Sequence, residues 1–173
     1  MQRSSLCVSR RTPTHPMLNK DFKEFIQLLN SSSTEFLIVG GYALAAHGHP
    51  RYTGDIDIWI GRTDKNIALV LEALREFGFG ELGISAADLS APNSVVQLGY
   101  PPARIDLLSS IDGVDFTTCY AKRVVMRIDD IELPIICEAD FRANKFATGR
   151  LKDLADVEAL DQGKENMGDH RVK

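Results

Sequence analysis

One segment constrains this chain more than any other: residues 36–60, FLIVGGYALAAHGHPRYTGDIDIWI. It opens with a continuous apolar run that predicts a buried strand, and Gly40 and Gly41 end that strand. Residues 42–47 predict a short helix that follows at once. Glycines at such a junction let a ligand approach the backbone, and free N–H groups at a helix start favour an anion. The segment therefore predicts a strand–turn–helix unit suited to a phosphate.

The next predicted strand carries two carboxylates on one face. Asp55 and Asp57 alternate with isoleucines, and a period of two places both acids on the same side of a strand. Unpaired neighbouring carboxylates repel each other, whereas a divalent cation stabilises them, and hard oxygen ligands suit magnesium. Asp106 alternates with apolar neighbours in the same way, as expected if its strand lies beside the first. Three such acids predict a site for metal ions that activate a hydroxyl and stabilise phosphoryl transfer.

The remaining pattern predicts a mixed α and β domain over residues 17–162. Apolar spacing predicts helices over 21–30, 64–78, 139–148 and 151–160, and strands over 35–39, 55–60, 94–98, 104–108, 124–128 and 131–136. Residues 79–93 contain glycines, serines and a proline, and predict a loop. We therefore expect an α/β (α+β) fold, with a small mixed β-sheet flanked by helices and helices at the C-terminal end.

Both ends of the chain are predicted to lie outside this domain. Residues 1–16 contain three arginines, two prolines and no acid, which predicts a disordered tail; Met17 is a candidate initiator and a transit peptide is the second interpretation. Residues 163–173 are polar and predict a flexible C-terminal tail.

Composition excludes several classes of protein. The net charge of −4 leaves residues 17–173 with a balance of −7, which argues against broad gripping of nucleic acid. No apolar run is long enough to cross a bilayer, so we expect no membrane partner. Three cysteines without a CxxC spacing fit a reducing compartment, and we expect a cytoplasmic protein.

These motifs resemble those of the DNA polymerase β-like nucleotidyltransferase superfamily. Gly40-Gly41, then Asp55-Ile56-Asp57-Ile58, then Asp106 match its glycine pair, its Dh[D/E]h strand and its later third acid. Arg51 and Thr53 ahead of the paired acids make the segment more similar to the AbiEii-type branch, which includes toxins of toxin–antitoxin pairs. The resemblance implies that Asp55, Asp57 and Asp106 are catalytic and bind two Mg²⁺ ions, with Mn²⁺ as the alternative. It also implies that Gly40, Gly41, Arg51 and Thr53 bind the nucleotide.

A second resemblance lies at residues 144–156, NKFATGRLKDLAD, which are similar to the lysine and R-x-x-D-x-x-D motifs of that branch. It implies that Lys145 and Arg150 help to hold the triphosphate and that Asp153 supports catalysis nearby. Physically, Lys145, Arg150 and Lys152 form a local basic cluster in an acidic chain. The alternative is an exposed helix face on which Lys152 and Asp156 form an i,i+4 pair.

Together the resemblances imply transfer of a nucleoside monophosphate from an NTP to a hydroxyl, with release of pyrophosphate. The acceptor is open between a tRNA 3′ end, a protein and a small molecule. An antitoxin partner and a homodimer are further expectations, because the chain is short for a transferase with its own acceptor domain. Two alternatives stay open: a nucleotide-binding regulatory or toxin–antitoxin module with little catalysis, and another magnesium-dependent phosphotransferase.

Overall fold

A computed structural model describes residues 18–128 and 130–168. The predicted tail over residues 1–16 and the last five residues of the chain lie outside the described residues. The helices that the structure describes include none that is both long and apolar enough to cross a membrane.

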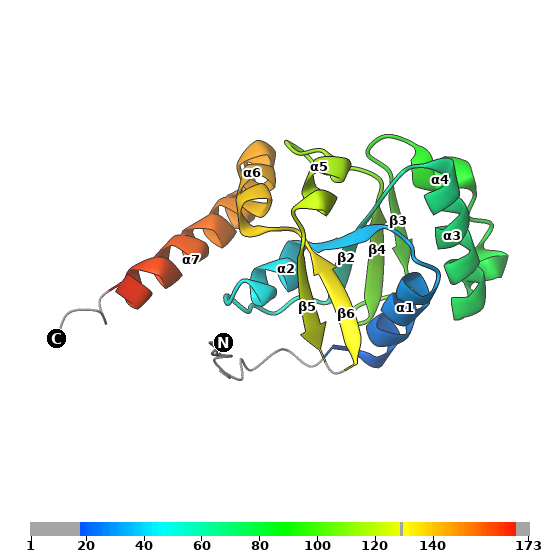
Figure 1. The fold of residues 1–173 in the computed structure, drawn as a ribbon, viewed down its shortest axis with the longest axis horizontal. Coiled ribbons are helices and arrows are strands. Elements are labelled where there is room, and N and C mark those ends of the chain that lie inside the picture. The colour runs from blue at the N-terminus through cyan, green and yellow to red at the C-terminus, as the bar shows by residue number, and fades with distance from the viewer. Residues whose placement is uncertain (1–17, 129, 169–173) are drawn as a thin grey trace, which may run out of the picture.

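A six-stranded mixed sheet forms the centre of the domain (Figure 1). Its strand order is β3-β4-β2-β1-β6-β5. In chain order the strands are β1 (Phe36–Val39), β2 (Asp55–Ile60), β3 (Val95–Leu98), β4 (Arg104–Leu108), β5 (Val124–Ile128) and β6 (Ile131–Ile135). The central strand β1 runs antiparallel to β2 and parallel to β6, and β2 runs parallel to β4. The outer pairs, β3 with β4 and β5 with β6, are antiparallel.

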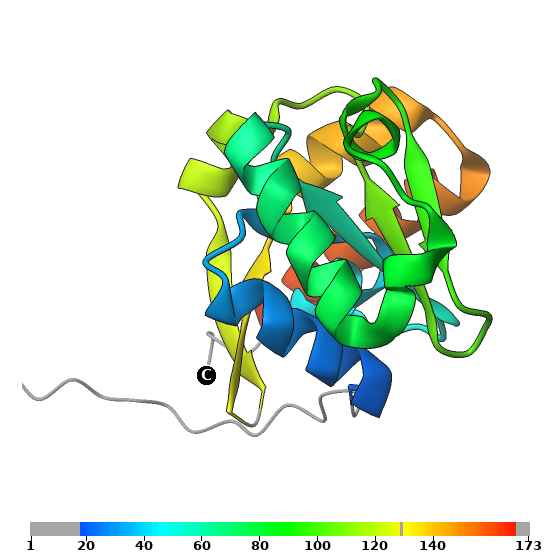
Figure 2. The same cartoon turned by 90° about the vertical axis from the view of Figure 1, so that its right-hand side faces the viewer.

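Helices cover both faces of this sheet, which confirms the predicted fold class. They are α1 (Lys20–Ser31), α2 (Gly40–Ala46), α3 (Asp64–Leu74), α4 (Ala86–Ser90), α5 (Phe116–Ala121), α6 (Glu138–Thr148) and α7 (Leu151–Gly168). In Figure 2, α1 and α3 lie in front of the strands, whereas α6 and α7 lie behind them. The buried face of α1 consists of Phe22, Phe25, Ile26 and Leu29, at the spacing expected for one helical stripe.

The two faces of β2 lie in different surroundings. Its isoleucines Ile56 and Ile58 are fully buried, while Asp55 and Asp57 are only partly buried on the opposite side. Trp59 is also buried and packs edge-on against Phe116, with ring centroids 5.1 Å apart. Period-two alternation thus directs Ile56 and Ile58 to one face of β2 and places Asp55 and Asp57 on the other face, which Trp59 shares.

Several element boundaries differ from the sequence predictions by one or two residues, and the differences are larger in three segments. The helix predicted over 64–78 is α3 to Leu74, followed by a π-helical turn (Arg75–Phe79) in which Gly78 has φ 101°. The predicted loop 79–93 contains a 3-10 turn (Gly80–Leu82) and α4, whose start is fixed by a capping box between Ser85 and Asp88. The helix predicted over 151–160 is α7, which continues to Gly168 and therefore includes residues 163–168 of the predicted C-terminal tail.

Candidate functional site

Strand pairing brings the three predicted acids to one place. In the parallel β2–β4 pair, Asp57 lies opposite Asp106 and Asp55 lies opposite Arg104. Because residues two apart on a strand share a face, all four side chains lie on the same side of the sheet. Asp106 is buried, whereas Asp55 and Asp57 are partly exposed. The predicted juxtaposition of three carboxylates is therefore present.

The glycine at the start of α2 makes room for one of these acids. Gly40 directly follows β1 and has φ 61°, a conformation that side chains rarely adopt. A Cβ at this position would lie 2.0 Å from Oδ2 of Asp57. Gly41 is also confined, because a Cβ there would lie 3.1 Å from Cβ of Thr53. The space at Gly40 is thus filled by the Asp57 carboxylate.

Asp57 differs from the other two acids in its electrostatic environment. Burial, together with the nearby charges of Asp55 and Asp106, raises the pKa of Asp57 to about 6, although the cations Lys145 and Arg104 act to lower it. Asp55 accepts a hydrogen bond from Thr53 Oγ1 at 2.5 Å. At Asp57, the effect of the two neighbouring acids therefore exceeds that of the two neighbouring cations.

This raised pKa gives a pH dependence of stability that a single variant isolates. A folded-state pKa near 6, against an ordinary value of 3.8, stabilises the protein at low pH, and that contribution is lost as pH rises through 6. At pH 8 and without metal, we expect Asp57→Asn to be more stable than the wild type by up to about 3 kcal/mol. At pH 4 the difference should nearly vanish. Urea unfolding of both proteins across this range measures it, and a pH-independent difference would contradict the assignment.

Arg104 joins two of the carboxylates and was not among the residues predicted for the site. Its Nε and Nη2 donate to Oδ1 and Oδ2 of Asp106, both at 2.9 Å, and Nη2 also donates to Oδ2 of Asp55. The bidentate geometry is the one in which guanidinium and carboxylate pair most strongly. The signal was available in the sequence, because Arg104 precedes Asp106 by two residues on the same strand.

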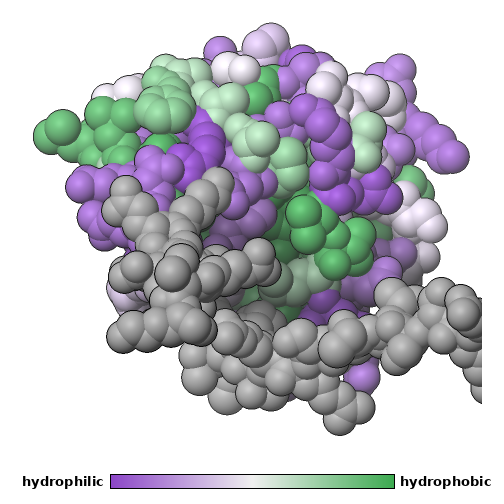
Figure 3. All heavy atoms as spheres, turned by 60° about the vertical axis from the view of Figure 1, so that its left-hand side comes forward, coloured by the Kyte–Doolittle hydropathy of each residue, from purple (hydrophilic) through white to green (hydrophobic). Residues whose placement is uncertain are grey.

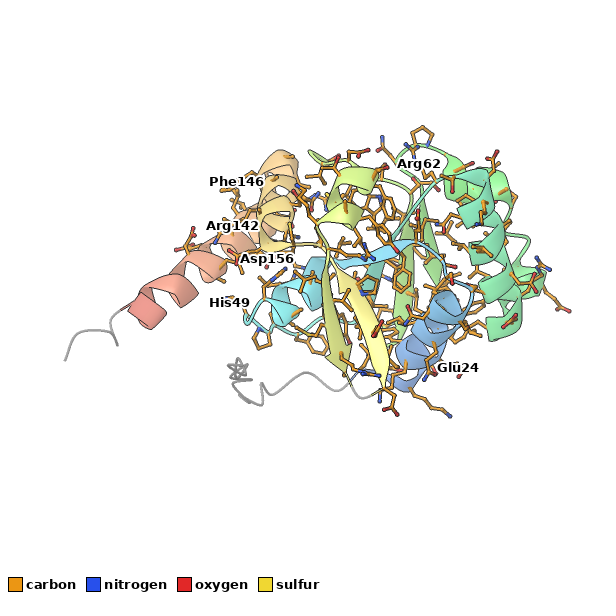
Figure 4. The ribbon with its side chains drawn as sticks, viewed as in Figure 1. Glu24, His49, Arg62, Arg142, Phe146 and Asp156 are labelled. Atoms are coloured by element: carbon orange, nitrogen blue, oxygen red, sulfur yellow. The ribbon has the colours of Figure 1, made fainter. Side chains whose placement is uncertain are left out.

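A second group of charges joins α6 and α7 to the segment before β2. Lys145 Nζ lies 2.5 Å from Oδ1 of Asp153 and 3.3 Å from Oδ2 of Asp156. Arg51 donates to both oxygens of Asp156, at 2.9 and 3.1 Å. Thr148 Oγ1 donates to Asp153 at 2.7 Å. Figure 4 shows Asp156 between α7 and the body of the domain, whereas Phe146 lies on the outer side of α6.

These pairs assign different environments to the predicted basic cluster. Lys145 is 7% exposed, and its charge is balanced by two aspartates, Asp153 and Asp156. Burial acts to raise the pKa of Asp153, but the hydrogen bonds from Lys145 and Thr148 lower it overall. Arg150 and Lys152 are exposed, and neither forms an ion pair with another residue that the structure describes. The alternative Lys152–Asp156 pair does not form.

A cavity of about 440 Å³ is lined both by the three acids of β2 and β4 and by residues of the charged group that joins α6 and α7. All ten residues predicted for the site line it: Gly40, Gly41, Arg51, Thr53, Asp55, Asp57, Asp106, Lys145, Arg150 and Asp153. The cavity is also lined by Asn93, Ser110 and Asp112, which the sequence did not single out, and by Asn144. Asn144 donates to the backbone oxygen of Asp112, which ties α6 to the loop after β4. The loop residues lacked a motif that would have marked them.

The chemistry of the acids fits a divalent cation, although their present arrangement does not form a ready site. Burial is the main cause of the raised pKa of Asp57, and the charges of Asp55 and Asp106 that add to it are charges a cation would offset. Within residues 18–128 and 130–168, however, three or more acidic, histidine or cysteine side chains nowhere converge as a metal-holding group. Arg104 accounts for this difference, because it lies between Asp55 and Asp106.

The molecular surface outside this cavity is mixed. On the face in Figure 3, hydrophobic patches alternate with hydrophilic ones. Two of the most exposed large side chains, Tyr52 and Tyr100, are 86% exposed. Such isolated apolar side chains are usual on a protein surface.

Comparison with known proteins agrees with the character of the site. The model of a family described as "Nucleotidyltransferase of unknown function" matches residues 17–164. No curated protein matches the sequence significantly. Among solved structures, a Thermotoga maritima protein provisionally described as a nucleotidyltransferase is similar in structure, with a TM-score of 0.47 and 10% identity. That match covers 85% of this chain and 90% of the other.

Proposed function

We propose that this chain, which belongs to that family of nucleotidyltransferases of unknown function, transfers a nucleoside monophosphate from an NTP to a hydroxyl acceptor. The observation that carries the proposal is the placement of Asp55, Asp57 and Asp106 on adjacent strands at one wall of the cavity. Arg150 and Lys152 line the same cavity, are exposed to solvent, and supply positive charge there.

In the proposed reaction, the acceptor oxygen bonds to the α-phosphorus and the bond to pyrophosphate breaks. The hydroxyl proton passes to the carboxylate of Asp106. Mg²⁺, or Mn²⁺ in its place, would be held by Asp55, Asp57 and Asp106 and would supply positive charge for the phosphates. The residues of the chain therefore position the acceptor and receive its proton.

We propose that exposed basic residues at the cavity hold the triphosphate. Arg150 and Lys152 are exposed at the cavity and free to contact phosphate oxygens. Lys145 is already paired with Asp153 and Asp156, so we propose that it acts through its charge, which favours the ionised form of Asp57. Arg51, which is held by Asp156, would support the same wall of the cavity. Gly40 and Gly41 remain proposed contacts through their backbone N–H groups.

One observation favours a second candidate, a nucleotide-binding module with little catalysis. Asp55 and Asp106 are already ion-paired with Arg104, which satisfies part of the charge that catalysis would use. Such a module would bind an NTP in the same cavity without turnover. Kinship with the AbiEii-type branch, and thus pairing with an antitoxin, belongs to this candidate as well as to the first.

The remaining features of the function are proposals supported by composition. The acidic body favours a short acceptor, such as an RNA 3′ end, a protein hydroxyl or a small molecule, over a long nucleic acid. We also propose action in the cytoplasm, and a homodimer in which a second copy helps to complete the acceptor site.

The proposed reaction is tested with each of the four NTPs, labelled at the α-phosphate, in a cell lysate with Mg²⁺. We expect the label to enter one fraction, RNA, protein or small molecule, with pyrophosphate released in equal amount. Omission of the protein is the control for background transfer. Binding of an NTP without incorporation into any fraction would favour the second candidate.

A further inference from the structure

Arg104 makes contacts that a bound cation would also make. Its guanidinium reaches both oxygens of Asp106 and one oxygen of Asp55, so three carboxylate oxygens share one positive charge. These are two of the three acids in the proposed metal site. The third, Asp57, has no hydrogen bond from Arg104 among the contacts of the described residues.

The charges of Asp55, Asp57, Asp106 and Arg104 do not balance one another. Three ionised carboxylates and one guanidinium leave a formal charge of −2, which equals the charge that one divalent ion supplies. Arg104 thus offsets part of the repulsion that would otherwise separate Asp55 from Asp106.

The same guanidinium obstructs the cation that it partly replaces. A metal ion on Asp55 and Asp106 needs oxygens that now accept hydrogen bonds from Arg104. A guanidinium and a divalent ion between the same carboxylates would also repel each other. The Arg104 side chain is 26% exposed, so it can move toward solvent without crossing the core.

We infer that Arg104 is a positioning residue whose ion pairs with Asp55 and Asp106 and the binding of a divalent cation exclude each other. The inference rests on the proposed function only in placing a cation at these three acids. Arg104 holds the carboxylates together in the metal-free protein and leaves when the ion binds. The apparent metal affinity is then reduced by the fraction of molecules in which Arg104 is paired.

The affinity for Mn²⁺ alone tests this inference, and it is measured from the electron paramagnetic resonance signal of the unbound ion. We expect Arg104→Gln to bind Mn²⁺ about tenfold or more tightly than the wild type. Arg104→Lys, which cannot form the bidentate pair, should lie between them. Arg127→Gln is the same substitution on β5, at the far edge of the sheet, and should leave the Mn²⁺ affinity unchanged. Equal or weaker binding by Arg104→Gln, or no Mn²⁺ binding by any of the proteins, would overturn the inference.

A second measurement separates displacement of Arg104 from a general effect of its charge. The Nε–H resonance of Arg104, assigned by its absence in Arg104→Gln, should lose its hydrogen-bonded shift as Mg²⁺ saturates the wild type. If that resonance stays unchanged while Mg²⁺ binds, the guanidinium and the ion coexist and the inference is wrong. This measurement also serves if Arg104→Gln does not fold, with Arg104→Lys used for the assignment.

Neither measurement contains an NTP, so the two proposals can fail separately. A chain that transfers no nucleotide but whose Arg104→Gln variant binds Mn²⁺ more tightly supports the role of Arg104 and contradicts the transferase. An active chain whose Arg104→Gln variant has unchanged affinity gives the reverse result.

Discussion

Replacing Asp57 with asparagine is expected to lower nucleotide transfer by a factor of about a hundred to a thousand. Asp57 is the acid that Arg104 leaves without an ion pair, and Asp55 and Asp106 act on it from either side. Asparagine keeps the size of the side chain but removes the charge that would hold a cation. Initial rates of label incorporation, at saturating NTP and Mg²⁺, measure the loss.

A matched control for this variant is Asp64→Asn, which makes the same change at an exposed position at the start of α3. It should transfer nucleotide at the wild-type rate. Because Asp57→Asn is expected to be more stable than the wild type at pH 8, unfolding cannot explain its inactivity. Transfer by Asp57→Asn within a factor of a few of the wild type would contradict the role assigned to this carboxylate.

Asp156→Asn is expected to destabilise the fold by about 3 kcal/mol, the largest effect we expect from a substitution outside the three acids. Asp156 is 4% exposed and receives both a bidentate pair from Arg51 and a contact from Lys145. Without its charge, Asp153 alone balances the buried Lys145. The melting temperature should fall by about 6–12 °C, as measured by circular dichroism.

The same helix provides the control for this prediction. Asp161 also lies on α7 and pairs with Arg142 at 2.9 Å, but its side chain is 61% exposed. An exposed pair contributes little, so Asp161→Asn should change the unfolding free energy by less than about 1 kcal/mol. If the two variants are equally stable, the charges around Asp156 do not hold α7 to the domain.

Local periodicity explains why much of the fold could be predicted from sequence. The alternation of acids with apolar residues placed β2 and β4 correctly, and the apolar stripe of α1 matched its buried face. The order of strands could not be predicted, because the parallel contact of β1 with β6 joins residues almost a hundred positions apart. The capping box of α4 was visible as Ser85 and Asp88, but the surrounding glycines and proline favoured a loop.

The candidate site divides in the same way between local and distant causes. Every predicted residue lines the cavity, and each was found in one of a few short motifs of the sequence. Which charged residues pair with one another could not be predicted in this way, because it depends on how the elements pack. Lys145 is neutralised only because α7 returns against α6, and Arg51 meets Asp156 over 105 positions of sequence. The sequence showed a basic cluster, whereas packing decides which of its members stay available.

The contact between Gly40 and Asp57 links two positions that sequence motifs treat as separate. With Oδ2 of Asp57 only 2.0 Å from where a Cβ at residue 40 would stand, the glycine and the acid fit together or not at all. A lineage that lost the acid would thereby release the glycine from this steric constraint, although its φ of 61° would still favour glycine or asparagine. The residue at position 40 is thus coupled to the carboxylate at position 57, and we expect relatives that lack this acid to carry residues other than glycine at position 40 more often than relatives that keep it.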